Sequence, residues 1–580
     1  MFSKGKLKIR LLMASTLIPA QLFIFNITTI VVGNEQYLSS SLPGLVGGSF
    51  LPFLVVSTAL YLISRALVDE DQENMIWFVL PAGFFLLWIQ SQLLVWDYGG
   101  LTGASIDWRG SSWRGLVDAV IWIAVVLTVF LLRSRIRSNL FRLATAIALL
   151  QFVVSLYSIT GDILSRSNSL SKDKGLESIR EFSQDQNVIH LIIDGFQSDI
   201  LEELLENEPY GSRYAEKFQG FTFFRENISV FPYTQFSVPT YLSTEIYRNK
   251  QQKEQFIDGA LSGNTIISEA KKNGFKVDLA VNGPYFTKRH SALPHDNIVD
   301  IDEVALGNSL LRDLTLTWDM SLFRSVPHFV KPLIHNQQKW LFYRFTFDDV
   351  RNKFDYFLHT EFLNRLSKSV VVESGRPVYK LIHVGHTHRP MILNQRCEYA
   401  GRILPDTRVT LAIQSACTMD RVIEFLDRLR QVGIYESSLI VIHSDHGGWV
   451  PTLRDGYKIP LGDGQAPDSA ASLASALLMV KPPGAQGSLE TSNNLTSLIN
   501  IPDTISEVMK FDVSFGHDSV FNIREQDPPT RKHMFYLWHR DEWENDFTQP
   551  IVEYTIQGSH FESEWQESNI YVSREGLRLN

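Results

Sequence analysis

The sequence has few cysteines, no excess of basic residues, and no long apolar run beyond about residue 160. With two cysteines among 580 residues, a cysteine-rich zinc site is excluded. The formal net charge of −9 excludes the basic surface typical of a general nucleic-acid binder, so no nucleic acid is expected as a partner. A chain of this length is too long to fold around a single hydrophobic core, so at least two domains are expected.

The two cysteines, Cys397 and Cys417, lie 20 residues apart in the part of the chain that has the composition of a soluble protein. Two interpretations stay open. They form one disulfide in an oxidising compartment, or they are two unpaired small core residues. Spacing in the sequence does not fix the Cα separation that a bridge needs.

The first 160 residues hold five apolar stretches that are long enough, or nearly so, to cross a hydrocarbon layer of about 30 Å. They cover residues 11–33, 45–65, 75–96, 116–132 and 140–160. The first is too long for a cleavable signal peptide, and four similar stretches follow it. For the fourth, the shortest, a buried soluble helix is the alternative. We therefore expect a five-helix membrane bundle over residues 1–161 and a polar linker over 162–186.

Basic residues in the short loops predict the orientation of these spans, because Lys and Arg are enriched on the cytoplasmic side. They occur at the N-terminus (Lys4, Lys6, Lys8, Arg10) and between the fourth and fifth stretches (Arg133, Arg135, Arg137). Both segments are expected in the cytoplasm, so an odd number of spans places everything after about residue 161 outside. The acidic loop 66–74 fits less well, although acidic residues count little in the rule. No span carries a charge near its centre, which disfavours a transporter.

Strand-like and helical patterns alternate beyond residue 187, which predicts an α/β domain with a mainly parallel sheet. Two strand-like runs end in acidic residues: VIHLIID in Asp194, and SSLIVIHSDHGG in Asp445 and His446. The carboxyl ends of parallel strands are where α/β sheets place ligands. Taken singly, each motif is explained by a turn or a capped loop. Together, two carboxylates and one imidazole predict a site for one divalent ion, with Zn²⁺ or Mn²⁺ favoured over Ca²⁺.

A candidate nucleophile lies in the segment ENISVFPYTQFSVPTYLSTEIY. Thr234 precedes Ser237 and Pro239, which fit the N-cap and the first turn of a short helix. A hydroxyl just before a helix N-terminus meets backbone N–H groups and a partial positive charge, which stabilise an alkoxide and a bound phosphoryl group. Metal ligation would lower the hydroxyl pKa further. Considered alone, Thr234 is explained as an ordinary turn threonine.

The order of these motifs, with His388 in HTHRP between Thr234 and the Asp445-His446 pair, resembles the alkaline phosphatase superfamily in its sulfatase-like branch. The likeness covers about residues 187–525. It implies a catalytic domain in which Asp194, Thr234, Asp445 and His446 bind the metal. It also implies that Thr234 is the nucleophile and that His388 stabilises charge or protonates the leaving group.

Two departures from the family pattern refine this expectation. Sulfatases of the formylglycine type need Cys or Ser in a Cys/Ser-x-Pro-x-Arg motif, whereas residues 234–238 read TQFSV. A phosphothreonine intermediate is therefore favoured over sulfatase chemistry. Two-metal relatives carry an Asp-x-x-x-His pair, and its best-placed spelling here, Asp355 to His359, lies in an apolar helical pattern. One metal ion is thus favoured, with His517 as a further, weaker ligand candidate.

Membrane spans followed by such a domain look like the membrane phosphoglycerol and phosphoethanolamine transferases. This resemblance implies a multi-pass protein of the bacterial inner (cytoplasmic) membrane with a periplasmic catalytic domain. It implies a phospholipid as head-group donor and an envelope glycan or lipid as acceptor. A membrane-anchored hydrolase of phosphate or sulfate esters on periplasmic glycans is the alternative, and a non-catalytic envelope scaffold is the second.

Several residues near His388 are weaker candidates for substrate binding. Strand alternation places His386 on the same side as His388, and His383 opposite them as a core residue. Basic residues that could contact an anion are Lys380, Arg389 and Lys458. The tail 526–580 is rich in aromatic residues and alternates, which predicts a strand-rich extension of unknown role.

Overall fold

The computed structural model describes residues 4–34, 38, 40–67, 73–98, 106, 108–168, 175–306, 310–336, 340–347, 354–448, 469–524, 529–537, 545–562 and 565–573. Its contacts divide the chain into two compact units. The first comprises Met1–Asp173 and Gly307–Asp349, and the second comprises Lys174–Leu306 and Val350–Asn580. We call them the helical unit and the sheet unit.

The helical unit begins with a nearly unbroken helical run formed by α1 (Lys4–Ala20), η1 (Gln21–Phe25) and α2 (Asn26–Gly33). The following helices are α3 (Leu42–Leu67), α4 (Glu73–Gln92), α5 (Ser112–Leu131) and α6 (Arg133–Asn168). Four segments are long and apolar enough to cross a membrane: Ile9–Gly33, Leu42–Ala66, Ser112–Leu131 and Asn139–Leu164. They confirm four of the five predicted spans as suitable helices.

The third predicted span, 75–96, is not confirmed as a full crossing, because the described apolar part of α4 is the shorter Val79–Gln92. The fourth predicted span is longer than its sequence pattern suggested. Its helix, α5, exposes large apolar side chains such as Leu116 (66%) and Ile123 (59%). Exposed apolar surface of this extent suits lipid rather than a soluble core, which argues against the buried-helix alternative.

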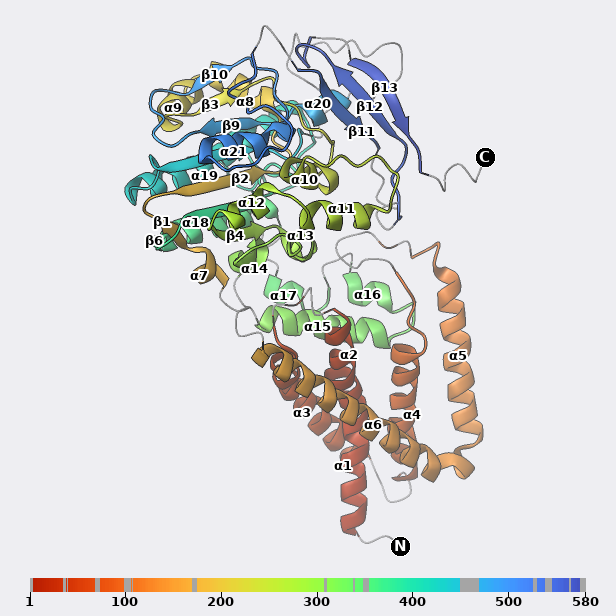
Figure 1. Ribbon diagram of the computed structural model, residues 1–580. Coiled ribbons are helices and arrows are strands. Elements are labelled where there is room, and N and C mark those ends of the chain that lie inside the picture. Colours follow the sequence, from red (N-terminus) through yellow and green to blue (C-terminus); the bar gives the residue numbers. More distant parts are fainter. Residues whose placement is uncertain are drawn as a thin grey trace. The chain divides into compact units, whose positions relative to one another are not determined.

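A segment far along the chain belongs to the helical unit and not to the sheet unit. It contains α15 (Leu310–Ser325), α16 (Lys331–His335) and α17 (Arg344–Phe347), and α15 lies across the ends of α2 and α4 (Figure 1). The Asn26 side chain donates to Ser325 Oγ (2.7 Å), and Ser321 Oγ donates to the Leu22 carbonyl (2.6 Å). Residues 307–349 fall within the catalytic domain expected from the sequence (187–525), because helical periodicity does not reveal which partner a helix packs on.

The sheet unit is built on eight strands in the order β10-β3-β9-β8-β2-β7-β4-β5. All neighbours pair in parallel except β9, which is antiparallel to both β8 and β3. The mainly parallel sheet is therefore confirmed. The strands are β2 (Asn187–Ile193), β3 (Thr222–Phe224), β4 (Lys276–Val281), β5 (Asn297–Asp300), β7 (Val378–Val384), β8 (Ser438–His443), β9 (Leu478–Lys481) and β10 (Glu490–Ser492).

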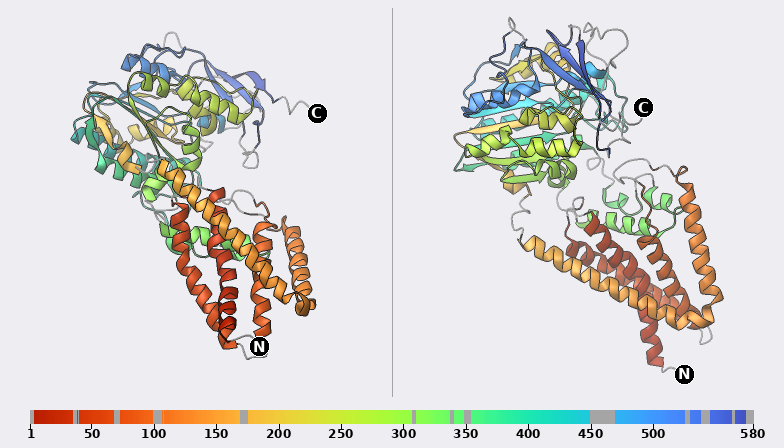
Figure 2. Two further views of the ribbon diagram at one scale, coloured as in Figure 1. Left: turned by 60° about the horizontal axis from the view of Figure 1, so that its bottom comes forward. Right: turned by 45° about the vertical axis from the view of Figure 1, so that its right-hand side comes forward.

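Helices cover both faces of this sheet (Figure 2). One face packs on α8 (Ser198–Glu206), α18 (Asp355–Ser369) and α19 (Arg408–Gln431), and the other on α10 (Thr234–Ser243), α12 (Ile266–Lys272) and α21 (Ile501–Met509). The central strand β2 is buried at all seven positions, as expected for a parallel strand between two helical layers. The remaining helices are α7 (Gly175–Ile179), α9 (Tyr210–Lys217), α11 (Lys253–Ser262), α13 (Gly283–His290), α14 (Ile301–Leu306) and α20 (Ser469–Ala474).

Two smaller sheets complete the unit. Strands β1 (Glu181–Ser183) and β6 (Val371–Ser374) form a parallel pair. Near the C-terminus, β11 (Arg531–Phe535), β12 (Ile551–Ile556) and β13 (Trp565–Tyr571) form an antiparallel sheet.

Cys397 and Cys417 form a disulfide, with their Cα atoms 5.5 Å apart. The bond joins the segment after β7 to the first half of α19. Of the two interpretations that the sequence left open, the structure has the bonded one.

Candidate metal centre

Three neighbouring strands, β2, β7 and β8, end at one edge of the sheet. Ile193 at the end of β2 pairs with Val384 at the end of β7, and Ile192 pairs with His443 at the end of β8. The residues that follow these strands therefore meet, because parallel strands in register place their carboxyl ends together.

Asp194, Asp445 and His446 converge at this edge. Each offers one ligand atom, and these atoms lie within 4.8 Å of one another with all three residues buried. The Nε2 atom of His446 is 3.6 Å from Asp194 Oδ1 and 3.5 Å from Asp445 Oδ2. The chain thus gathers two carboxylates and one imidazole from two strand ends.

The hydrogen bonds of these residues fit a cation in their midst. Asp445 Oδ1 accepts from the amides of Gly195 (3.2 Å) and His446 (3.0 Å). By contrast, Asp194 Oδ1 and Asp445 Oδ2 are buried without a hydrogen-bond donor among the described residues. Buried carboxylate oxygens without a partner are costly, and a divalent ion would supply the missing partner. Two oxygen ligands and one nitrogen suit Zn²⁺ or Mn²⁺.

The loop after β8 fixes the orientation of the imidazole. His446 Nδ1 donates to the Gly447 carbonyl (2.7 Å), so the lone pair of Nε2 is directed to the carboxylates, as in most metal-binding histidines. Gly447 itself packs against backbone: a Cβ atom there would lie 1.8 Å from the Ser472 carbonyl oxygen. Only glycine is compatible with this turn.

Thr234 is the first residue of α10, and its Oγ1 lies 3.4 Å from His446 Nε2. It is half-buried, whereas the rest of α10 is buried. Its hydroxyl is therefore both near the three predicted ligands and accessible at the helix N-terminus, where unpaired N–H groups favour an anion.

The helix starts earlier in the chain than the sequence analysis predicted. Ser237 is not the N-cap, because Tyr233 takes that position with extended backbone (φ −142°, ψ 149°) and no side-chain cap. The Ser237 hydroxyl instead donates to the Asp445 carbonyl (2.5 Å). A tertiary hydrogen bond has thus replaced the local cap, and it joins α10 to the loop that carries Asp445 and His446.

Electrostatics at the site favour a bound cation. Burial, reinforced by the nearby Asp445 carboxylate, raises the pKa of Asp194 well above its ordinary value. Burial acts the same way on Asp445, but His446 and His383 outweigh it and lower the pKa of that carboxyl. Two carboxylates this close cannot both ionise cheaply without a positive charge between them.

The histidines at the end of β7 and just after it differ from the orientation that strand alternation predicts. His383 Nε2 lies 4.0 Å from Asp194 Oδ2, whereas the His386 side chain hydrogen bonds to Thr360 of α18 (3.2 Å). The strand ends at Val384, and Gly385 follows, so the two-residue alternation does not extend from 383 to 386. His386 therefore lies in the packed core. His383, expected from the sequence to be a core residue, is instead the one of these two histidines that lies beside Asp194.

His388 is half-buried in the loop after β7, and its amide donates to the Gly385 carbonyl (3.2 Å). Among the described residues, its side chain forms no hydrogen bond to Thr234 or to the three predicted ligands. Its expected role therefore stays a prediction.

The three basic candidates for substrate binding fare differently. Lys380 is buried in the middle of β7 and bonded to Asp278 Oδ2 (2.7 Å), which argues against contact with substrate. Arg389 is exposed, with its Nε 3.6 Å from Asp406 Oδ2. Lys458 lies outside the described residues.

The weaker metal candidates have partners of their own. His359 Nε2 lies 3.3 Å from Asp302 Oδ1, and its Nδ1 accepts from the Gly385 amide (2.5 Å). A Cβ atom on Gly385 would approach Asp355 Oδ2 to 3.2 Å, so this pair lies beside the end of β7. His517 is exposed on the loop after α21.

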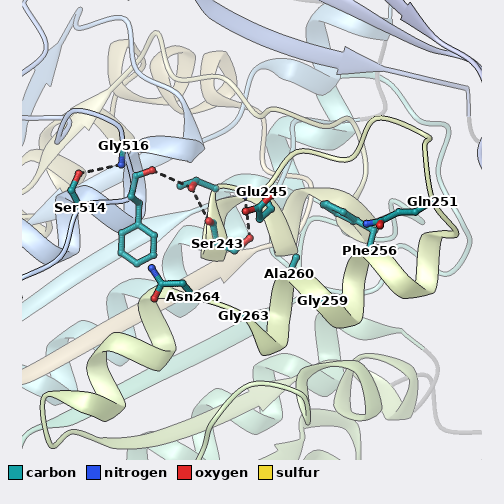
Figure 3. A pocket seen from close by; sticks show the side chains of 12 residues that line it. Ser243, Glu245, Gln251, Phe256, Gly259, Ala260, Gly263, Asn264, Ser514 and Gly516 are labelled. Atoms are coloured by element: carbon teal, nitrogen blue, oxygen red, sulfur yellow. Dashed lines mark hydrogen bonds between the residues drawn. The ribbon is translucent and has the colours of Figure 1, made fainter.

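A cavity of about 540 Å³ lies in the sheet unit, at the opposite end of α10 from Thr234 (Figure 3). Ser243, Glu245, Asn264 and Ser514 contribute polar groups to its wall. Because Thr234 and Ser243 lie at the two ends of a ten-residue helix, this cavity is separate from the candidate metal centre.

The C-terminal sheet contacts the segment that carries Thr234, which the sequence did not reveal. The Met534 amide donates to the Val230 carbonyl (2.7 Å). The ring of Tyr536 packs on Tyr233 and Phe236, with centroids 5.1 and 5.7 Å apart. This sheet therefore supports the start of α10 from outside the central fold.

No family model and no curated protein sequence matches the chain. Solved structures do match. A protein in the alkaline phosphatase superfamily from Vibrio parahaemolyticus shares 12% identity (67% of this chain, 80% of that one, TM-score 0.37).

Two further matches carry names of activities. The lipoteichoic acid synthase LtaP from Listeria monocytogenes shares 14% identity (66% of this chain, 85% of that one, TM-score 0.37). The integral membrane lipooligosaccharide phosphoethanolamine transferase A (EptA) from Neisseria meningitidis shares 12% identity (88% of this chain, 96% of that one, TM-score 0.35). Values this low say nothing about substrate, so the proposed function rests on the site itself.

Proposed function

We propose that the chain is a membrane-bound, metal-dependent phosphotransferase. It moves a phospholipid-derived head group, phosphoethanolamine or phosphoglycerol, to an envelope glycan or lipid. One observation carries the proposal: the Thr234 hydroxyl, at the N-terminus of α10, lies 3.4 Å from a histidine that itself converges with two buried carboxylates.

Asp194, Asp445, His446 and Thr234 would hold one divalent ion, Zn²⁺ or Mn²⁺. When bound, such an ion supplies Lewis-acid stabilisation of phosphoryl oxygens and lowers the pKa of the threonine hydroxyl. Unpaired N–H groups in the first turn of α10 add hydrogen bonds to the phosphoryl group.

The chemistry proceeds in two displacements. Thr234 Oγ forms a bond to phosphorus, and the bond from phosphorus to the glycerol oxygen of the lipid breaks, leaving diacylglycerol and a phosphothreonine that carries the head group. The Thr234 hydroxyl gives up its proton to solvent, and His388 gives the departing oxygen its proton. An acceptor hydroxyl then attacks phosphorus and passes its proton to His388, while the Thr234 oxygen leaves and regains a proton from solvent, so that the head group is transferred.

The proposed location is the bacterial inner membrane, with the N-terminus cytoplasmic and the sheet unit periplasmic. The basic N-terminus and the basic loop between α5 and α6 support this orientation. The Cys397–Cys417 disulfide supports an oxidising compartment for the sheet unit. On the chain, we propose a membrane domain over 1–161 that also includes 307–349, a catalytic domain over 187–306 and 350–525, and an accessory extension over 526–580.

The test uses the purified full-length protein, phosphatidylethanolamine and phosphatidylglycerol labelled in the head group, and mass spectrometry of the protein. We expect Thr234 to gain the mass of phosphoethanolamine or phosphoglycerol, with diacylglycerol released in equal amount. Thr234→Ala should abolish the adduct, while Thr491→Ala, an exposed threonine on β10, should leave it intact.

Other outcomes would redirect the proposal. Release of free head group with no labelled acceptor would support the hydrolase. An adduct on another residue would remove Thr234 from its role. A cellular phenotype that survives Thr234→Ala would support the scaffold.

A further inference from the structure

A second cavity, of about 350 Å³, lies within the helical unit. Its wall is formed by the end of α2, the segment that follows α4, and the helices α15 and α16. The lining residues are Ile30, Asn34, Val95, Trp96, Asp97, Tyr98, Met320, Phe323, Arg324 and Lys331. We call it the α15 pocket.

Two cations, Arg324 and Lys331, line the α15 pocket. Neither forms a salt bridge with any of the described residues. Arg324 is half-buried, and its Nε donates to the Ser91 carbonyl (2.6 Å). Lys331 is 2% exposed, and its Nζ donates to the Phe323 carbonyl and lies 4.7 Å from the centroid of that ring. Carbonyl and ring contacts stabilise a cation only partly, so each retains a charge that an anion would neutralise.

Other enclosed cations of the chain are held in two ways. Arg312, on the same helix as Arg324, pairs with Asp313 (3.1 Å), and buried Lys380 pairs with Asp278 (2.7 Å). Among the described residues, Lys481 is buried with carbonyl and ring contacts alone. What distinguishes Arg324 and Lys331 is therefore that two such cations line one cavity.

Nearby carboxylates do not replace an anion ligand. Asp118 accepts from the Trp96 indole (2.7 Å) and from the His328 amide (2.8 Å); its charge acts on Lys331, but it forms no salt bridge with Lys331 or Arg324 among the described residues. Asp97 lines the pocket but is exposed. Burial lowers the pKa of Lys331 to about 8, which leaves the ammonium charged at neutral pH.

The surroundings indicate where such an anion would come from. Aromatic side chains, Trp96, Tyr98 and Phe323, form part of the wall, as is typical of the membrane interface. The segment of the helical unit that carries α15, α16 and α17, here called the insertion, exposes large apolar side chains, including Phe329 (60%), Leu333 (72%) and Phe345 (75%). Apolar side chains beside enclosed cations, at the ends of apolar helices, suit a molecule with acyl chains and an anionic head.

We propose that the α15 pocket binds the phosphate of a membrane phospholipid, with Arg324 and Lys331 as its anion contacts. Arginine and lysine together offer several N–H donors for phosphate oxygens. The exposed apolar side chains of the insertion would lie against the acyl region. This binding needs no turnover, so it holds or fails separately from the proposed transferase activity.

The test is native mass spectrometry of the full-length protein, with phosphatidylglycerol, diacylglycerol, and glycerol phosphate as separate probes. We expect retained phosphatidylglycerol, no retained diacylglycerol, and at most weak binding of glycerol phosphate. Removing both cations, with Arg324→Gln and Lys331→Met, should weaken phosphatidylglycerol binding at least about tenfold. Arg344→Gln, an exposed cation on α17 of the same insertion, should leave it unchanged.

A second variant guards against loss of folding in the first. Met320→Trp fills the pocket while keeping both cations, and it should also reduce binding. If both variants retain as much phosphatidylglycerol as the wild type, the proposal is overturned. Equal retention of diacylglycerol would show an acyl-chain groove without head-group recognition, and glycerol phosphate binding as tightly as the lipid would show a soluble-anion site; either result overturns it.

Discussion

The hydroxyl of Ser237 donates a hydrogen bond to the backbone carbonyl of Asp445 (2.5 Å). This contact links the helix that begins with Thr234 to the loop that supplies two of the predicted metal ligands. A hydrogen bond between segments more than two hundred residues apart thus helps to position Thr234 relative to Asp445 and His446.

Ser237→Ala tests that link. The substitution leaves a buried carbonyl oxygen without its donor, which should cost about 1–3 kcal/mol of stability. Because the contact orients the ligand loop, metal affinity should fall by roughly tenfold or more. Ser243→Ala is the matched control: it removes a buried hydroxyl at the other end of α10, bonded to the Pro239 carbonyl (2.8 Å). Calorimetric titration with Zn²⁺ and thermal unfolding separate the two effects, and equal metal affinity in both variants would contradict the positioning role.

Asp194→Asn should have opposite effects with and without metal. In the metal-free protein it removes a buried charge next to Asp445, so stability should rise by roughly 1 kcal/mol. Metal added at a hundredfold excess over its dissociation constant should stabilise the wild type by about 2.7 kcal/mol and the variant much less. Melting temperatures measured with chelator and with Zn²⁺ or Mn²⁺ give both numbers. A variant that gains as much from metal as the wild type would exclude Asp194 as a ligand.

Gly447→Ala should disrupt the ligand loop. A Cβ atom at this position would lie 1.8 Å from the Ser472 carbonyl oxygen and 2.6 Å from that of Ser475, so backbone has to move. We expect a loss of about 3 kcal/mol or more, together with loss of metal binding. Gly259→Ala is the comparison, since nothing lies within 4 Å of its Cβ position in α11 and a helical alanine is favoured by about 1 kcal/mol. Thermal unfolding of the two variants should shift in opposite directions.

The surroundings of Glu226 predict how the free energy of unfolding depends on pH. It is 4% exposed, and it accepts hydrogen bonds from Ser559 Oγ (2.9 Å) and His560 Nδ1 (3.0 Å). Burial alone would raise its pKa, but these bonds and the charge of His560 lower the pKa to about 2. The folded protein therefore binds this proton less readily than the unfolded chain.

The stabilisation from Glu226 is fully present above the ordinary glutamate pKa of about 4.5 and is lost as pH falls toward 2. Its size is on the order of 3 kcal/mol. Thermal unfolding between pH 7 and about pH 2.5 should show a steeper loss for the wild type than for Glu226→Gln. Glu490→Gln, an exposed carboxylate on β10, should follow the wild type. Parallel curves for wild type and Glu226→Gln would refute the assignment.

Much of the site was predictable because it depends on where parallel strands end. The runs ending at Asp194 and Asp445 read as buried strands, and the rule that neighbouring parallel strands end together brings their carboxylates side by side. The orientation of His383 and His386 was not predictable. Alternation holds only within a strand, and the sequence does not mark Val384 as its last residue.

The helical insertion shows the other limit. Residues 310–325 have a pattern that fits packing on a sheet or on other helices, and the choice depends on partners such as Asn26 and Leu22, some three hundred residues away. Likewise, Ser237 has the features of a cap, but a carbonyl from a distant loop competes for its hydroxyl. Local preference was overruled by tertiary contacts in both cases.

Because α15 to α17 belong to the helical unit while the residues before and after them belong to the other, the polypeptide crosses between the two units three times. Truncation after α6 would not separate the two units. A shortened protein starting at Gly175 would still carry α15, and the α15 surface that packs on α2 and α4 would be exposed to solvent. Such a fragment should be prone to self-association, and replacing 307–349 with a short polar connector is the modification that would make the sheet unit tractable in isolation.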